Sequence, residues 1–296
     1  MQSQFFIRNI LNSMIDEGQR WLPKLEKHFK SDVVSIYGYI EAEMMGKVHI
    51  LCERCRSKSR WEDLTLIIST NGGDIGGVEY FRDYIKPLYK NVNIVVVDKA
   101  FSTGTLLSLH ADKLYVFEHA KFGMIDPQVE NGHSAFYWFN SANERIFNYE
   151  ADAINEGLKN EVYEQIIKEK QQQSDLIKNY IDRWEVIEKV KYTAWEGLSR
   201  CKIVNTRNEA VKVILYLLDV RGSRDHKTNV RPDALWEMGL RYEMLKPMQS
   251  KRENKFSVAH AYHGSISLYL KDPDSEMYQA GNRLSCFTQS RYDQYY

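Results

Sequence analysis

Two neighbouring stretches decide the fold: residues 64–74 read LTLIISTNGGD and residues 94–104 read IVVVDKAFSTG. Each opens with an apolar, β-branched run, as a buried parallel strand does, and then breaks at small and polar residues. Helical spacing follows the first break, and a short helix to about residue 111 is expected after the second. A further strand at 114–117 and a turn at 123–128 complete the pattern. Strands and helices in alternation predict an α/β fold with a parallel sheet and right-handed crossovers.

The rest of the chain is organised around this centre. An amphipathic pattern predicts an N-terminal helical segment over 1–30. The central domain is predicted over 31–218, and 219–296 is expected to be a C-terminal extension of unknown role. The elements expected outside the two decisive stretches are a strand at 32–40, a helix at 41–56, long charged helices over 143–184, a turn at 192–198, a strand at 202–204, helices at 209–218 and 235–245, and an alternating stretch at 256–270.

Composition indicates a soluble protein with a sizeable core. The 296 residues carry 40 basic and 40 acidic side chains, a balance that gives no reason to expect nucleic acid or an anionic membrane as partner. The mean hydropathy is −0.51, and no uninterrupted apolar run approaches the roughly 20 residues that span a bilayer. Four cysteines do not make a disulfide framework, and no signal-peptide pattern opens the sequence. A cytoplasmic location is therefore expected.

Two pairs of residues could in principle bind a metal, but we expect a structural role for both pairs. Cys52 and Cys55 share one face of the helix predicted at 41–56 with apolar residues, so buried thiols are expected rather than half of a zinc site. His260 and His263 lie in the alternating stretch without a carboxylate or cysteine at ligand spacing. We therefore expect neither a metal nor another cofactor.

The chemistry is expected at the turns that follow the two decisive strands, because parallel sheets bind ligands beyond the carboxyl ends of their strands. Attack on an acyl carbon creates an oxyanion, which two fixed backbone N–H groups stabilise. A Gly-Gly turn and a helix N-terminus can both supply such groups, and Ser102 stands where an exposed nucleophile would. Taken singly, Gly-Gly is most often a turn and such a serine most often an N-cap. The local AFSTG also departs from the G-x-S-x-G turn of α/β-hydrolases.

Four motifs together resemble one superfamily. They are NGGD at 71–74, STGT at 102–105, ADKLY at 111–115 and GMIDPQ at 123–128. In this combination the chain resembles the Clp protease proteolytic subunit and its relatives over roughly 31–130. Within that superfamily it looks most like the serine dehydrogenase proteinase branch, near signal peptide peptidase A. A weaker similarity continues through 183–184 and 193–198.

The resemblance implies a fold and a set of site residues. The fold is the ClpP/crotonase-like spiral of repeated ββα units with a largely parallel sheet, here with long C-terminal helices and an α+β extension, and it usually forms homo-oligomers. The implied nucleophile is Ser102, and the N–H groups of Gly73 and Thr103 are the implied oxyanion hole. Gly72, Asp74 and Gly104 lie beside them in sequence, and Asp74 is expected mainly to hold its turn or cap the next helix.

The general base is the open question. Clp subunits carry a histidine where this chain has Asp126, so Asp126 is expected to order its turn instead. His110 lies about 12 Å along the helix from Ser102, out of reach. His119 and His133 remain candidates, although surface roles are the ordinary expectation for both. Signal peptide peptidase relatives use a lysine from a later segment, for which Lys159 is one candidate among several.

Three functions remain open at this stage. The leading prediction is a serine-dependent hydrolase, a peptidase that acts on peptide or protein substrates. The alternative is an inactive ClpP-like oligomer that serves as a scaffold or binds a partner protein through 219–296, whose aromatic composition suits an interface. Acyl-CoA chemistry of the crotonase kind is a third possibility, against which the serine at the nucleophile position argues.

Overall fold

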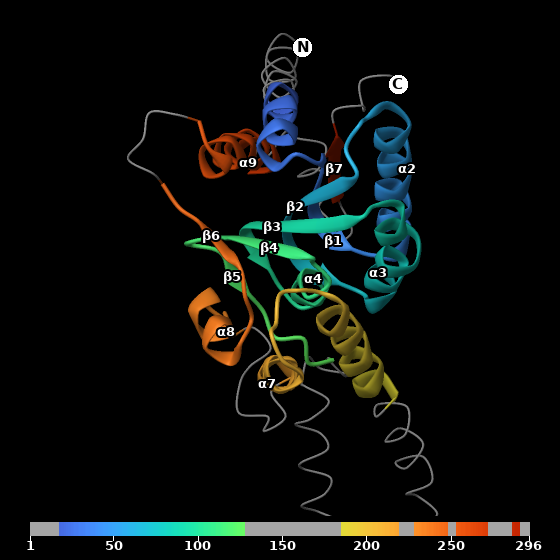
Figure 1. Ribbon diagram of the computed structural model, residues 1–296, viewed down its shortest axis with the longest axis vertical. Helices are drawn as coiled ribbons and strands as arrows, with labels where there is room; N and C mark the ends of the chain where they lie inside the picture. Colours follow the sequence, from blue (N-terminus) through green and yellow to red (C-terminus); the bar gives the residue numbers. More distant parts are fainter. Residues whose placement is uncertain (1–17, 128–184, 219–227, 248–252, 272–285, 291–296) are drawn as a thin grey trace, which may run out of the picture.

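The computed structural model describes residues 18–127, 185–218, 228–247, 253–271 and 286–290 (Figure 1). Its centre is a seven-stranded sheet in the order β6-β4-β3-β2-β1-β7, with the short β5 paired to β3. The strands are β1 (Asp32–Ile40), β2 (Asp63–Gly73), β3 (Asn91–Ala100), β4 (Lys113–Phe117), β5 (Lys121–Phe122), β6 (Glu243–Leu245) and β7 (Cys286–Ser290). All pairings among them are parallel except that of β7 with β1. The predicted α/β class with a largely parallel sheet is confirmed.

Helices cover both faces of this sheet (Figure 1). On one side α2 (Ala42–Lys58) packs against β1, and α4 (Thr103–Ser108) packs against β2 and β3. Between them α3 (Ile75–Tyr80) runs into a π-helical turn, η1 (Phe81–Ile85), and then a 3-10 turn, η2 (Lys86–Leu88). The other side is covered by α9 (Lys255–Lys271). The remaining helices are 18–29, 185–200, α7 (Arg207–Leu218) and α8 (Pro232–Met238).

Alternation along β1 divides its side chains between the two layers. Ser35 accepts a hydrogen bond of 2.6 Å from the Tyr262 hydroxyl of α9, and the Tyr37 hydroxyl lies 3.1 Å from Nδ1 of His263. The intervening Val34 and Ile36 are fully buried. Successive strand residues point to opposite faces, so a strand buried on both sides reads as a continuous apolar run.

Two expectations for the later helices were wrong. Residues 192–198 were expected to form a turn, but they lie inside the helix 185–200. Gly197 packs closely within this helix: a Cβ there would meet the carbonyl oxygen of Leu109 at 2.8 Å and the His110 ring at 2.9 Å. The strand expected at 202–204 is irregular chain, tied down by the bond from Arg241 N–H to the Ile203 carbonyl.

The segment 219–296 also differs from expectation in its local structure. The helix predicted at 235–245 ends at Met238, because Gly239 adopts a left-handed conformation with φ of 115°. Residues 243–245 then extend as β6 beside β4. The alternating stretch 256–270 is helical, as α9, and it buries Val258, Tyr262 and Ile266 at helical spacing. The described parts of this segment add β6 and β7 to the central sheet and buried side chains of α9 to the core.

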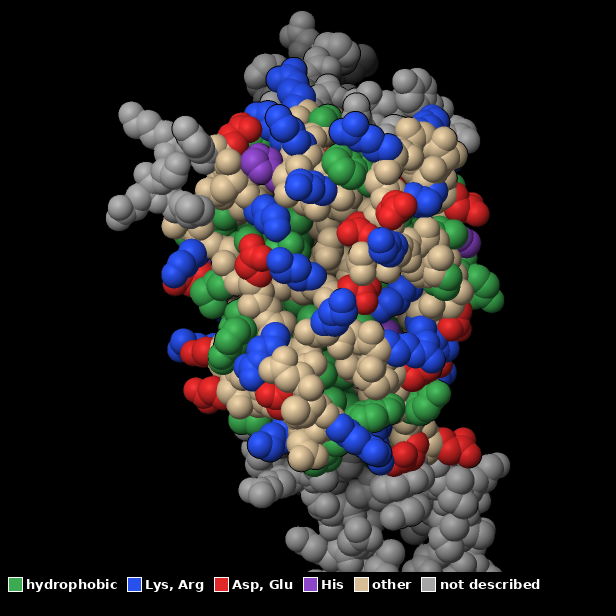
Figure 2. All heavy atoms as spheres, in the orientation of Figure 1, with side chains coloured by type: hydrophobic (Ala, Val, Ile, Leu, Met, Phe, Trp, Pro, Cys, Tyr) green, Lys and Arg blue, Asp and Glu red, His purple; other side chains and the backbone are tan. Residues whose placement is uncertain are grey.

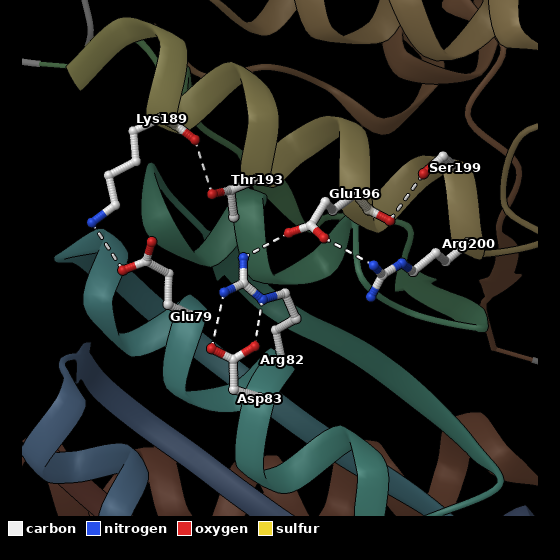
Figure 3. A network of polar contacts seen from close by, with 8 residues as sticks. All are labelled: Glu79, Arg82, Asp83, Lys189, Thr193, Glu196, Ser199 and Arg200. Atoms are coloured by element: carbon white, nitrogen blue, oxygen red, sulfur yellow. Dashed lines mark hydrogen bonds and ion pairs between the residues drawn. The ribbon is translucent and has the colours of Figure 1, made fainter. Parts of the chain in front are cut away.

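A polar network fixes the helix 185–200 against α3 and η1 (Figure 3). Arg82 donates to Glu196 at 2.6 Å and forms a two-point contact with Asp83. Glu196 also accepts from Arg200, and Lys189 pairs with Glu79 at 2.9 Å. The pair of Arg82 and Glu196 is largely buried, so it is sheltered from solvent in a way that isolated surface pairs are not. Asp83, Lys189 and Arg200 lie at the exposed edge of the network.

The surface mixes both signs of charge. Figure 2 shows lysine and arginine side chains interspersed with acidic ones over the face it presents, in keeping with the equal totals of the sequence. Among the helices of the described residues, none is long and apolar enough to cross a membrane. Cys52 and Cys55 are fully buried on α2, as predicted.

Candidate active site

Two turns meet where β2 and β3 end. The glycine turn, residues 70–74, consists of the last four residues of β2 and Asp74, and the serine turn, residues 100–104, leads from β3 into α4. Thr70 pairs with Ala100 in the β2–β3 register, and the Phe101 N–H donates to the Thr70 carbonyl at 3.1 Å. The two turns, 30 residues apart in sequence, are therefore direct neighbours, as the sequence pattern predicts.

The glycine turn has a backbone that only glycine adopts readily. Gly72 has φ of 117° and Gly73 has φ of 154°. A Cβ on Gly73 would lie 1.9 Å from the carbonyl oxygen of Ile40, so the turn presses directly on the end of β1. A Cβ on Gly72 would meet Cβ of Ser102 at 3.1 Å. Because Gly72 and Gly73 have no side chains, the glycine turn can lie this close to its neighbours.

Ser102 has a strained backbone, with φ of 49° and ψ of −114°. Within the described residues only Lys30 is another non-glycine with positive φ. Such conformations cost about 1–3 kcal/mol and persist where the surroundings enforce them, often at functional sites. Although Ser102 stands at the N-cap position of α4, its side chain makes no capping bond. Ser102 is therefore an N-cap by position only, and its hydroxyl does not bond to the first turn of α4.

The sequence AFSTG lacks the first glycine of G-x-S-x-G, yet its turn resembles that motif in its backbone conformation and in the small residues around the serine. Nucleophile turns of that kind place a strained serine between a strand and a helix, with small residues two positions to either side. Here those positions are Ala100, which is fully buried, and Gly104. A Cβ on Gly104 would lie 2.2 Å from Cγ2 of Thr70, so glycine is required there.

Three threonine hydroxyls tie the turns to their surroundings. Thr70 Oγ1 lies 2.9 Å from the Gly72 nitrogen and accepts its N–H. Thr103 Oγ1 donates to the Gly73 carbonyl at 2.9 Å. Thr105 Oγ1 lies within hydrogen-bond distance of both carbonyls that flank it, those of Ala100 and Gly123. Sequence reasoning missed Thr70 and Thr105, although the final threonine of the STGT motif was a visible signal.

Two acidic residues near the turns, Asp74 and Asp126, lie in different places. Asp74 is the N-cap of α3, and its carboxylate accepts the Gly77 N–H at 3.1 Å, which confirms the capping expectation. Asp126 is buried, 2% exposed, in the segment after Gly123. That segment lies directly behind the serine, because a Cβ on Gly123 would meet Cα of Phe101 and the nitrogen of Ser102 at 3.0 Å.

The candidate bases do not gather at Ser102 in the described residues. His119 is exposed and contacts the Phe117 ring edge-on. His110 is buried beyond the end of α4, and burial, helped by nearby Lys86, lowers its pKa to about 3, so it is neutral at physiological pH. Lys159 and His133 lie outside the described residues. Within the described part of the chain the Ser102 hydroxyl has no hydrogen-bond partner.

Comparison with known proteins gives similarity of chain path only. No protein-family model matches the sequence, and no curated protein is significantly similar to it. Similar solved structures include a mutant of the 1510-N membrane-bound stomatin-specific protease, at 14% identity over 73% of this chain and 79% of that one, with a TM-score of 0.43. ClpP1 from Listeria monocytogenes is another, at 15% identity over 73% and 92%, with a TM-score of 0.44. The function must be argued from this chain's own geometry.

Proposed function

We propose that the protein is a serine hydrolase, and more specifically a peptidase, with Ser102 as its nucleophile. The observation that carries the proposal is the strained backbone of Ser102, at the start of a helix, with a side chain that caps nothing. A strained serine with no structural use for its hydroxyl is what a preorganised nucleophile requires. The glycine turn runs beside this serine, since a Cβ on Gly72 would lie 3.1 Å from the Ser102 Cβ.

The proposed reaction is acyl transfer. Ser102 Oγ attacks the carbonyl carbon of a peptide bond and loses its proton to a base. The resulting oxyanion accepts hydrogen bonds from the N–H groups of Gly73 and Thr103. Thr103 is the first residue of α4, so its N–H has no partner within the helix and lies at the positive end of the helix dipole. The tetrahedral intermediate then collapses: the C–N bond breaks, the amine leaves with the proton returned by the base, and the acyl group stays on Ser102 Oγ. Water that loses a proton to the same base attacks this ester, and Ser102 Oγ leaves with that proton, which releases the carboxylic acid and restores the hydroxyl.

The base is proposed to come from outside the described residues. Lys159 is the first candidate and His133 the second; His119, which is exposed, is the third. A lysine can act as base when desolvation lowers its pKa. The likeness to serine dehydrogenase proteinase and signal peptide peptidase A, a homo-oligomeric assembly and a cytoplasmic location belong to the same proposal. They rest on the NGGD, STGT and GMIDPQ motifs and on composition.

Covalent labelling with a fluorophosphonate probe tests the proposal. The wild-type protein should be labelled, and mass spectrometry should locate the adduct on the peptide that contains Ser102. Ser102→Ala should lose the label completely. Ser57→Ala removes an exposed serine of α2 and should label like the wild type. A label that survives Ser102→Ala would disprove the nucleophile, and loss of label in Lys159→Ala would support the base.

A scaffold without activity is the second candidate, and one observation favours it: among the described residues, no group that could serve as a base is hydrogen-bonded to the Ser102 hydroxyl. This candidate predicts no labelling of a folded wild-type protein. Deleting 219–296 would not test it cleanly, because β6, β7 and α9 would be lost from the sheet and its cover. Substituting the exposed Trp236 of α8, 45% exposed, is a milder test, since loss of assembly with retained fold would support a docking role.

A further inference from the structure

We propose that the Thr103 side chain is a positioning residue, whose hydroxyl holds the two oxyanion-binding N–H groups at a fixed separation. This inference rests on the proposed function and gives the side chain of Thr103 a role beside that of its backbone N–H. Its basis is the 2.9 Å hydrogen bond from Thr103 Oγ1 to the Gly73 carbonyl, which crosses from the serine turn to the glycine turn.

The bond joins the very residues that would supply the two donors. One end is the side chain of Thr103 and the other is the main chain of Gly73, so a movement of either turn stretches it. Thr103 is 6% exposed, which shelters the bond from competing water. A hydrogen bond in such a place fixes geometry more firmly than the same bond at the surface.

The glycine turn needs an external support of this kind. Two successive positive-φ glycines lack the side chains that would restrict their backbone. The described contacts hold the turn from three directions: Thr70 Oγ1 accepts the Gly72 N–H, the Asp74 N–H donates to the Ile40 carbonyl at 2.9 Å, and Thr103 binds the Gly73 carbonyl. Of these three, the Thr103 bond is the one that comes from the serine turn.

Holding both donors together has a catalytic consequence. Preorganised donors stabilise an oxyanion without reorienting during the reaction, whereas loosely held ones lose part of that advantage. Removing the hydroxyl leaves both N–H groups in the chain but frees their relative position. The chemical step should therefore slow, while binding of a small probe, which does not depend on the oxyanion, should change little.

The test measures fluorophosphonate labelling as a function of probe concentration, which separates the maximal rate of phosphonylation from the half-saturating concentration. Thr103→Val replaces the hydroxyl with a methyl group of similar size and should lower the maximal rate about 10- to 100-fold, by analogy with displaced or deleted oxyanion donors. The half-saturating concentration should stay within about twofold. Thr103→Ser retains the hydroxyl and should restore most of the rate.

The matched control is Thr193→Val. Thr193 is equally buried, and its hydroxyl donates to the Lys189 carbonyl within the helix 185–200, in the network of Figure 3. It should lose a similar amount of thermal stability without slowing the labelling. If the valine methyl group against the Gly73 carbonyl prevents folding, Thr103→Ala leaves space there and should show the same slow rate.

Three outcomes would overturn the inference, and they differ from one another. Unchanged labelling in folded Thr103→Val or Thr103→Ala would show that the hydroxyl does not position the donors, while the proposed nucleophile would stand. Equal slowing in Thr103→Val and Thr193→Val would mean that the slower labelling comes from a general loss of stability and not from a change in the position of the two N–H donors. A wild-type protein that is not labelled at all would remove the proposed function, and this inference with it.

Discussion

The glycine turn and the serine turn solve the same geometric problem in opposite ways. Both require positive φ at the end of a buried parallel strand. At the end of β2 the requirement falls on Gly72 and Gly73, for which such a backbone costs little. After β3 it falls on Ser102, for which it costs about 1–3 kcal/mol. The difference shows that the glycine turn needs only its backbone conformation, whereas the serine turn also needs a side chain. A glycine at 102 would relieve the strain but would remove the hydroxyl.

The largest effect should come from Gly73→Ala. The added Cβ would meet the Ile40 carbonyl at 1.9 Å, and a backbone atom in a central strand cannot move aside. We expect a loss of about 3 kcal/mol or more in the free energy of unfolding, or failure to fold. Urea denaturation measures it. Gly46→Ala is the matched control, because its nearest neighbour is the Tyr80 hydroxyl at 3.8 Å and α2 should gain about 0.5–1 kcal/mol. Equal stability of the two variants would contradict the contact.

Gly104→Ala should have the next largest effect. Its Cβ would meet Cγ2 of Thr70 at 2.2 Å, and this side chain is buried between the two turns. We expect a loss of about 1–3 kcal/mol, as for other overpacked cores. Adding Thr70→Ser removes the offending methyl group but retains the hydroxyl that binds Gly72. The double variant should be more stable than the sum of the single changes predicts, and simple additivity in denaturation experiments would argue against the clash.

At Ser102 itself we expect a smaller effect on stability, and a gain where the two preceding substitutions cause a loss. Ser102→Gly should be about 1 kcal/mol more stable than Ser102→Ala, since glycine accepts the backbone conformation and alanine does not. Neither variant should react with the fluorophosphonate probe. Lys30→Gly is a useful parallel, because Lys30 has φ of 56° at an exposed position and should also gain stability. A less stable Ser102→Gly would mean that the serine turn carries no strain.

The smallest effect on the site is expected from His110→Gln. Its ring is buried away from the serine turn and neutral at pH 7, so the labelling rate should not change. Stability should respond to pH instead. The unfolded chain takes up the His110 proton near pH 6.5, whereas the folded protein does so only near pH 3, so wild type loses stability as pH falls between these values. The melting-temperature difference between wild type and His110→Gln should therefore shrink from pH 7 to pH 4.5, and a constant difference would contradict the lowered pKa.

Sequence reasoning succeeded where local pattern decides structure. The strand at 32–40, the helix that buries Cys52 and Cys55, and the adjacency of the two turns all follow from periodicity and strand order. It failed where distant packing decides: residues 192–198 were expected to form a turn but are helical, and Gly197 among them allows close contact with His110. The strain at Ser102 and the bond from Thr103 to Gly73 depend on segments 30 residues apart, so no local signal could reveal them.

The pairing of β7 with β1 has a consequence for how the chain is made. Residues 34–38 find their outer partners only in residues 286–290, about 250 positions later. A ribosome synthesises this span over many seconds, during which β1 can pair with β2 while its other edge stays open. An open, apolar edge invites pairing with another nascent chain. We therefore expect stalled or shortened translation products of this protein to depend on chaperones far more than the finished molecule does.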